Sequence, residues 1–118
     1  MEKFSVSLPL TGEYLTTVRL TTGGLCALAG FDVDTAEDYK VCVTESLLIV
    51  KRNGFREADI EFTVGETLRC EVRGKRCDGA KEEELEEEIS RSLLAALIGE
   101  VEFVKNTEDR VEKIVFEG

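Results

Sequence analysis

Apolar and polar residues alternate at the start of the chain, where Phe4, Val6 and Leu8 are separated by serines. This period of two is typical of a β-strand with one buried face. Pro9 follows, and a proline favours the end of a strand because it has no backbone N–H to donate. The pattern therefore predicts a half-buried strand over residues 4–8.

Three later segments carry apolar residues at helical spacing, over residues 11–30, 34–53 and 81–98. Such spacing predicts amphipathic helices whose apolar stripes face a core. The predicted stripes are Tyr14, Val18, Leu25 and Leu28 in the first helix, Tyr39, Val43, Leu47 and Val50 in the second, and Leu85, Ile89, Leu93 and Leu97 in the third.

The helix ends carry capping signals. Thr11 is the predicted N-cap of the first helix, and Gly30 is its predicted C-cap. Asp34 and Glu37 form a capping-box-like pair at the start of the second helix, which Asn53-Gly54 ends.

Four further segments have the composition of strands. Residues 58–64 and 67–73 flank a tight turn, and residues 101–105 and 111–116 flank a polar one, so each pair predicts a hairpin. Residues 73–80 read as a basic, glycine-containing loop.

The order β-α-α-β-β-α-β-β groups the strands and the helices. It predicts an α+β two-layer sandwich in which three helices cover one face of a mixed, mostly antiparallel sheet. A length of 118 residues suits a single domain over 1–118.

The net charge of −10 limits the kinds of partner that the chain can attract, and the absence of histidine limits its chemistry. A negative field repels nucleic acids and anionic membranes and suits a basic protein partner, although acidity can also serve solubility alone. Without histidine, histidine-based catalysis and histidine metal ligands are excluded. No apolar run approaches the length of a membrane span and no signal peptide is visible, so we expect a cytoplasmic protein.

The four cysteines fall into two groups. Cys26, Cys42 and Cys70 stand among apolar residues and are expected to be reduced core side chains. Cys77 lies beside Lys75 and Arg76, which would favour its thiolate if it is exposed. No CxxC pair occurs, so we expect no metal site.

Three stretches in order, LPLTGEYLTTVRLTTGGL, GFDVDTAEDYKVCVTESL and ALIGEVEF, resemble the anti-sigma-factor serine kinases of bacteria. These are small members of the histidine-kinase-like (Bergerat, GHKL) ATPase superfamily. The resemblance implies that Glu45 matches the glutamate of the family's E-x-x-x-N motif, a general base or a residue that positions the attacking group. The asparagine that binds magnesium in the family is replaced by Ile49, which has no oxygen to offer a metal.

Two more features of the family's nucleotide site are missing. The family's D-x-G-x-G motif is replaced by RGKRCDG, in which Asp78 stands at the wrong spacing. The glycine-rich turn is replaced by KEEELEEE, whose acids at a helix start would repel a triphosphate, and residues 73–80 are too short to serve as a nucleotide lid. The resemblance therefore indicates a degenerate member without a lid, in which Glu45 is vestigial and neither ATP nor magnesium is a cofactor.

We expect a non-catalytic regulatory protein that binds a sigma factor or an antagonist-like protein, with homodimerisation possible. The family resemblance places the partner surface on the N-terminal strand and first helix, here Glu13, Tyr14 and Arg19. Two alternatives stay open. One is a divergent ATP- and magnesium-dependent serine protein kinase that acts on an anti-anti-sigma-type protein through Glu45. The other is a structural or small-molecule-sensing α+β domain.

Overall fold

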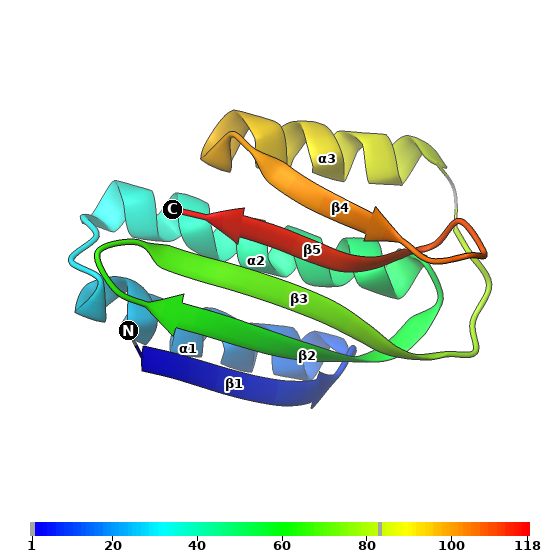
Figure 1. The fold of residues 1–118 in the computed structure, drawn as a ribbon, viewed down its shortest axis with the longest axis horizontal. Helices are drawn as coiled ribbons and strands as arrows, with labels where there is room; N and C mark the ends of the chain where they lie inside the picture. Colours follow the sequence, from blue (N-terminus) through cyan, green and yellow to red (C-terminus); the bar gives the residue numbers. More distant parts are fainter. Residues whose placement is uncertain (1, 83) are drawn as a thin grey trace.

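The computed structural model describes residues 2–82 and 84–118, and Glu83, which falls inside the third predicted helix, lies outside them. The elements follow the predicted order (Figure 1). Along the chain they are β1 (Glu2–Pro9), α1 (Gly12–Leu28), α2 (Val33–Arg52), β2 (Phe55–Val64), β3 (Leu68–Cys77), α3 (Glu84–Ile98), β4 (Val101–Lys105) and β5 (Val111–Glu117).

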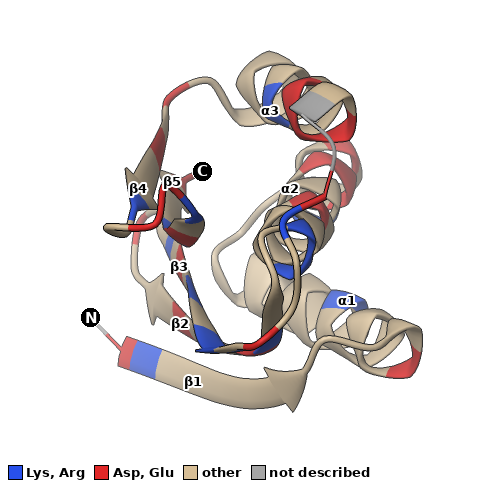
Figure 2. Ribbon diagram, turned by 90° about the vertical axis from the view of Figure 1, so that its right-hand side faces the viewer, with Lys and Arg blue, Asp and Glu red and all other residues tan. Residues whose placement is uncertain are grey.

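The strands form one open sheet in the order β1-β2-β3-β5-β4, and each neighbouring pair that the structure describes is antiparallel. The three helices lie on one face of this sheet, with α2 between α1 and α3 (Figure 2). The predicted α+β architecture is therefore confirmed, while the sheet is antiparallel throughout rather than mixed.

The core lies between α2 and the middle of the sheet. The stripe predicted for α2 is confirmed, since Tyr39, Val43, Leu47 and Val50 are fully buried. Alternate residues of β2 and β3 face them, as a period of two requires: Ala58, Ile60, Phe62, Leu68, Cys70 and Val72. The Tyr39 hydroxyl donates to the Leu68 carbonyl at 2.8 Å, so the largest core side chain leaves no polar atom unpaired.

The predicted helix caps are partly wrong. Gly30 lies one residue beyond Ala29, the C-cap of α1, at φ +78°, and the Phe31 N–H donates to the Cys26 carbonyl. This is a Schellman motif, which favours glycine because of the left-handed conformation. The N-cap of α2 is Asp32, whose side chain accepts from the Thr35 N–H at 2.8 Å, and not Asp34, which lies inside the first turn.

The predicted face of α1 is only half correct. Val18 and Leu25 are buried, but Tyr14 and Leu28 are 46% and 75% exposed. The buried side of the helix instead includes Thr22, whose hydroxyl donates to the Val18 carbonyl at 2.8 Å. This internal hydrogen bond pairs the buried hydroxyl and so offsets the cost of burying a threonine on the core side of α1.

The stripe predicted for α3 is wrong at its N-terminal half. Leu85 and Ile89 are 65% and 61% exposed, while Leu94 and Ser90 are buried against α2. Both sides of this helix carry apolar residues at helical spacing, so periodicity alone could not select the inner one. The packing of α3 against α2 determines which side of α3 is buried.

The basic loop predicted over residues 73–80 is mostly strand, because β3 continues to Cys77 and pairs with β2 as far as Phe55. Gly74 permits this pairing, since a Cβ there would lie 2.6 Å from the Phe55 ring. Lys75 and Asp59 form a 2.6 Å ion pair across the two strands. Within the described residues, no helix is long and apolar enough to cross a membrane.

Because Leu94 is buried and Leu85 is exposed, we expect alanine substitutions at these two positions of α3 to differ sharply in their effect on stability. Leu94→Ala should lower the free energy of unfolding by about 2 to 5 kcal/mol, because the buried side chain leaves a cavity. Leu85→Ala, at an exposed site on the same helix, should change it by less than about 0.5 kcal/mol. Urea unfolding of both variants measures the difference, and equal losses would contradict the packing of α3.

Candidate functional site

Glu45 lies on the side of α2 that faces α3, and its side chain is 23% exposed. Its Oε2 accepts a hydrogen bond from the Ser90 hydroxyl of α3 at 2.9 Å. Arg52 Nη1 donates to the same hydroxyl at 2.9 Å, and Arg52 Nη2 lies 3.9 Å from the Glu45 carboxylate. A carboxylate on this helix is therefore held by a serine and an arginine.

Ile49 stands one helical turn beyond Glu45 and is fully buried. Glu45, Ile49 and Asn53 share one face of α2 at a spacing of four residues, and Glu87, Ser90 and Leu94 share one face of α3. Ser90 contacts Glu45 while Glu87 contacts Asn53, so the two helices run antiparallel with these faces together. The position that the sequence resemblance would match to a metal-binding asparagine is therefore a buried aliphatic side chain.

Asn53, expected from the sequence only to end the helix, is a buried polar residue that joins several elements. It is 1% exposed, and its side-chain amide donates to the Ile49 carbonyl and to Glu87 Oε1 at 2.8 and 2.9 Å. Its side-chain oxygen accepts from the Val111 N–H at 3.0 Å. One amide therefore joins α2, α3 and the start of β5, and its oxygen is already committed to a backbone donor.

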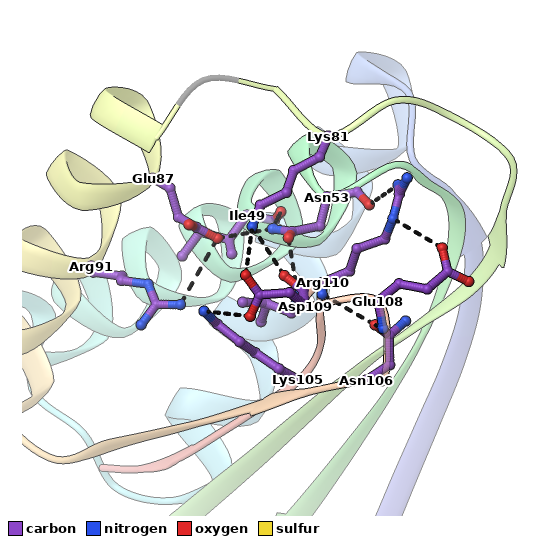
Figure 3. A network of polar contacts seen from close by, with 11 residues as sticks. Ile49, Asn53, Lys81, Glu87, Arg91, Lys105, Asn106, Glu108, Asp109 and Arg110 are labelled. Carbon is purple, nitrogen blue, oxygen red and sulfur yellow. Dashed lines mark hydrogen bonds and ion pairs between the residues drawn. The ribbon is translucent and has the colours of Figure 1, made fainter.

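Arg110 completes this junction from the turn between β4 and β5. Its Nη1 donates to the Asn53 and Gly79 carbonyls at 2.7 and 2.8 Å. In the same turn, the Asp109 carbonyl accepts from Lys81 Nζ at 3.0 Å (Figure 3). Gly79 and Lys81, which precede α3 in the chain, are thereby anchored to the β4–β5 turn.

The partner-binding candidates Glu13, Tyr14 and Arg19 all lie exposed on α1. The structure does not bring them to one spot. Helical spacing turns Arg19 well away from Tyr14, and Arg19 lines a shallow hollow of about 330 Å³ between α1 and α2, with Thr16, Leu20, Glu37 and Lys40. They also lie apart from Glu45, which contacts α3 on the other side of α2.

Larger hollows lie elsewhere on the described surface. One of about 620 Å³ lies where α3, β4 and β5 meet, and another of about 640 Å³ lies along the β2–β3 turn. Arg69 and Glu117 line both, and Glu45 lines neither. The space beside Glu45 is instead occupied by α3.

The cysteines divide as expected, because Cys26, Cys42 and Cys70 are buried and Cys77 is exposed. Burial raises the pKa of the Cys42 thiol to about 12, and it raises the pKa of the Cys26 and Cys70 thiols in the same way. Cys77 Sγ lies 3.8 Å from the Asn53 carbonyl oxygen, at the edge of the polar junction.

Comparisons with known proteins agree with part of the resemblance. No protein-family model matches the chain. The chain is 30% identical over 63 residues to the serine-protein kinase RsbW of Bacillus mycoides, across 53% of this chain and 39% of that protein. It is 34% identical over 64 residues to the serine-protein kinase RsbW of Listeria monocytogenes, across 53% of this chain and 41% of the relative.

The chain therefore spans about two fifths of the length of the curated relatives that it matches. This similarity supports the resemblance to the anti-sigma-factor serine kinases over about half of the chain. The sheet with helices on one face is compatible with the histidine-kinase-like fold.

The burial of Ile49 predicts the effect of placing an asparagine at this position. Ile49→Asn should lower the free energy of unfolding by more than about 1 kcal/mol, because it places an unpaired amide in the core. Lys51→Asn, at an exposed site of the same helix, is the control and should change stability by less than about 0.5 kcal/mol. An Ile49→Asn protein as stable as the control would mean that this position is open to solvent.

The exposure of each thiol predicts how rapidly it reacts with a labelling reagent. In the native protein a disulfide reagent should react rapidly with Cys77 alone, since the three buried thiols are inaccessible and hold their protons through burial. All four should react in denaturant, and Cys77→Ser should abolish the fast phase. Rapid reaction of a second thiol in the native protein would contradict the packing of α1, α2 or β3.

Proposed function

We propose that this chain is a non-catalytic regulatory protein that resembles an anti-sigma factor and binds a protein partner, either a sigma factor or an antagonist-like protein. The observation that carries the proposal is the packing of α3 onto α2 at Glu45 and Ile49, combined with similarity to serine-protein kinases. A protein that has kept the fold but closed its pocket can keep its partner surfaces, because these need not coincide with the pocket.

The residues around Glu45 support a degenerate nucleotide site. Magnesium requires oxygen ligands in octahedral geometry, and Ile49 offers none. Asn53 stands on the same face of α2, but its oxygen accepts a buried backbone N–H and its amide is paired twice. The Glu45 carboxylate is engaged by Ser90 and Arg52. We infer that neither ATP nor magnesium is a cofactor of this chain.

One observation favours the kinase alternative, namely that the matched relatives are serine-protein kinases. In that alternative Glu45 would act as the general base or would position the hydroxyl of an anti-anti-sigma-type substrate. It would require α3 to leave α2, because Ser90 occupies the carboxylate and Ile49 is covered. The non-catalytic function requires no such rearrangement.

The exposed N-terminal face of the molecule supports the partner role. Phe4 of β1 and Tyr14 of α1 are 42% and 46% exposed, and Glu13 and Arg19 are also exposed on α1, with Arg19 on a different side of the helix from Tyr14. Aromatic and arginine side chains dominate the energetics of many protein interfaces. β1 is also an edge strand whose outer backbone groups are available for pairing, so we propose this face for the partner and for any homodimer. A sigma-factor partner would place the protein in the cytoplasm.

Substitutions on α1 test this function. The triple variant Glu13→Ala/Tyr14→Ala/Arg19→Ala should weaken binding to a sigma factor or antagonist encoded in the same genome by at least about tenfold, since it removes an aromatic and an arginine anchor. Calorimetry with the purified partners measures the affinity. Glu66→Ala, in the exposed β2–β3 turn, is the surface control and should bind like the unsubstituted protein.

Glu45→Gln separates the two functions in the same experiment, and it should also bind like the unsubstituted protein. If the chain phosphorylates the antagonist and Glu45→Gln abolishes that transfer, the non-catalytic function is wrong. Unchanged binding by the triple variant would remove the α1 surface from the proposal.

A further inference from the structure

The outer side of α3 is apolar and uncovered in the described part of the chain. Leu85 and Ile89 stand one turn apart and are 65% and 61% exposed. Ser92 and Ala96 continue this side of the helix and are exposed as well. We name the surface formed by Leu85, Ile89 and their acidic neighbours Glu82, Glu86 and Glu88 the α3 outer face.

The inner side of α3 already satisfies the packing of the helix, so it does not account for these two residues. Leu94 and Ser90 are buried against α2, Glu87 bonds to Asn53, and the Arg91 guanidinium lies 4.3 Å from the centre of the Phe103 ring. A helix with one buried side usually exposes charged and polar residues on the other. Two large aliphatic side chains at a spacing of four on the solvent side instead form a ridge of the kind that packs into a partner.

The charges around this ridge are negative. Glu82 and Glu88 are exposed, and within residues 2–82 and 84–118 no ion pair engages either carboxylate. Glu86 is 62% exposed and lies 3.4 Å from Arg52. The nearby cations turn inward, since Arg52 is only 16% exposed and Arg91 covers Phe103. Acidic residues mark the N-terminal part of α3 in Figure 2.

We propose that the α3 outer face is a docking surface for a basic amphipathic helix of a partner protein. An apolar stripe at i and i+4 on such a helix would pack against Leu85 and Ile89. Lysine or arginine residues that flank the stripe would meet Glu82, Glu86 and Glu88.

Charge complementarity selects this occupant over the others. A second copy of the chain, with a net charge of −10, would bring the same three carboxylates into opposition. An anionic membrane surface would be repelled in the same way. A basic helix gains from both parts of the surface, because aliphatic stems of lysine can also cover the apolar ridge.

This surface is separate from the one proposed on α1, because α2 lies between the two helices (Figure 2). The inference therefore goes beyond the proposed function. A failure on α3 would leave partner binding through Glu13, Tyr14 and Arg19 untouched.

Fluorescence anisotropy with a labelled, stapled helical peptide tests the proposal on the full chain. The probe carries leucine at positions i, i+4, i+7 and i+11 and lysine elsewhere. Leu85→Ser/Ile89→Ser should weaken its binding by at least about tenfold, because both apolar contacts are lost. Glu82→Gln/Glu88→Gln should weaken it by about threefold or more and reduce the dependence of the affinity on salt.

Matched controls distinguish binding at the α3 outer face from non-specific attraction between a basic peptide and an acidic protein. Ile89→Ser alone should weaken binding more than Val33→Ser, which removes a branched side chain that is 77% exposed at the start of α2. A peptide with the same leucines and glutamate in place of lysine should bind at least about tenfold more weakly. Circular dichroism and urea unfolding confirm that each variant is folded.

The proposal is overturned if the lysine peptide fails to bind at submillimolar concentration, or if it binds Leu85→Ser/Ile89→Ser as well as the unsubstituted protein. Equal binding of the glutamate peptide would also overturn it. Analytical sedimentation tests whether a second copy of this chain, rather than a basic helix, covers the α3 outer face. If the unsubstituted chain self-associates and Leu85→Ser/Ile89→Ser is monomeric, the α3 outer face joins two copies of this chain and the basic partner is wrong.

Discussion

The packing of α3 along α2 is the constraint on which the character of the site depends. The Ser90 hydroxyl bonds to Glu45, Glu87 bonds to Asn53, and Leu94 is buried on the same side of α3. Because α3 covers this side of α2, Ile49 is a core residue and the Glu45 carboxylate has protein partners.

Polar groups at this junction are tolerated because nearly every one is paired. A buried amide without partners costs on the order of 1 to 3 kcal/mol, yet Asn53 makes three side-chain hydrogen bonds to three different segments. Arg110 satisfies the Asn53 carbonyl and links it to Gly79. Hydrophobic burial supplies most of the stabilisation, while this network fixes the start of α3 relative to the C-terminal end of α2.

The sequence predicts correctly those helices and strands that have a single apolar side. Alternation in β2 and β3 and the stripe of Tyr39, Val43, Leu47 and Val50 mark buried faces directly, since each has a single apolar side. It cannot orient α3, which is apolar on two sides, because the choice depends on a contact with α2 some forty residues away in sequence. The extension of β3 past Arg73 likewise depends on the fit of Phe55 against Gly74. The resemblance to a known motif singles out Glu45 and Ile49 in the sequence. Ser90, Asn53 and Arg110 come to this site only through the fold.

The central proposal is that α3 closes to nucleotides the side of α2 that carries Glu45 and Ile49, and titration calorimetry of the purified chain with Mg-ATP tests it most directly. A serine-protein kinase of the RsbW type, titrated in the same buffer, provides the positive control. We expect no heat of binding at high protein concentration and no rise in melting temperature with Mg-ATP. A micromolar dissociation constant that Glu45→Gln weakens would contradict the account, because it would show that a nucleotide reaches the face of α2 that Ser90 and Leu94 cover.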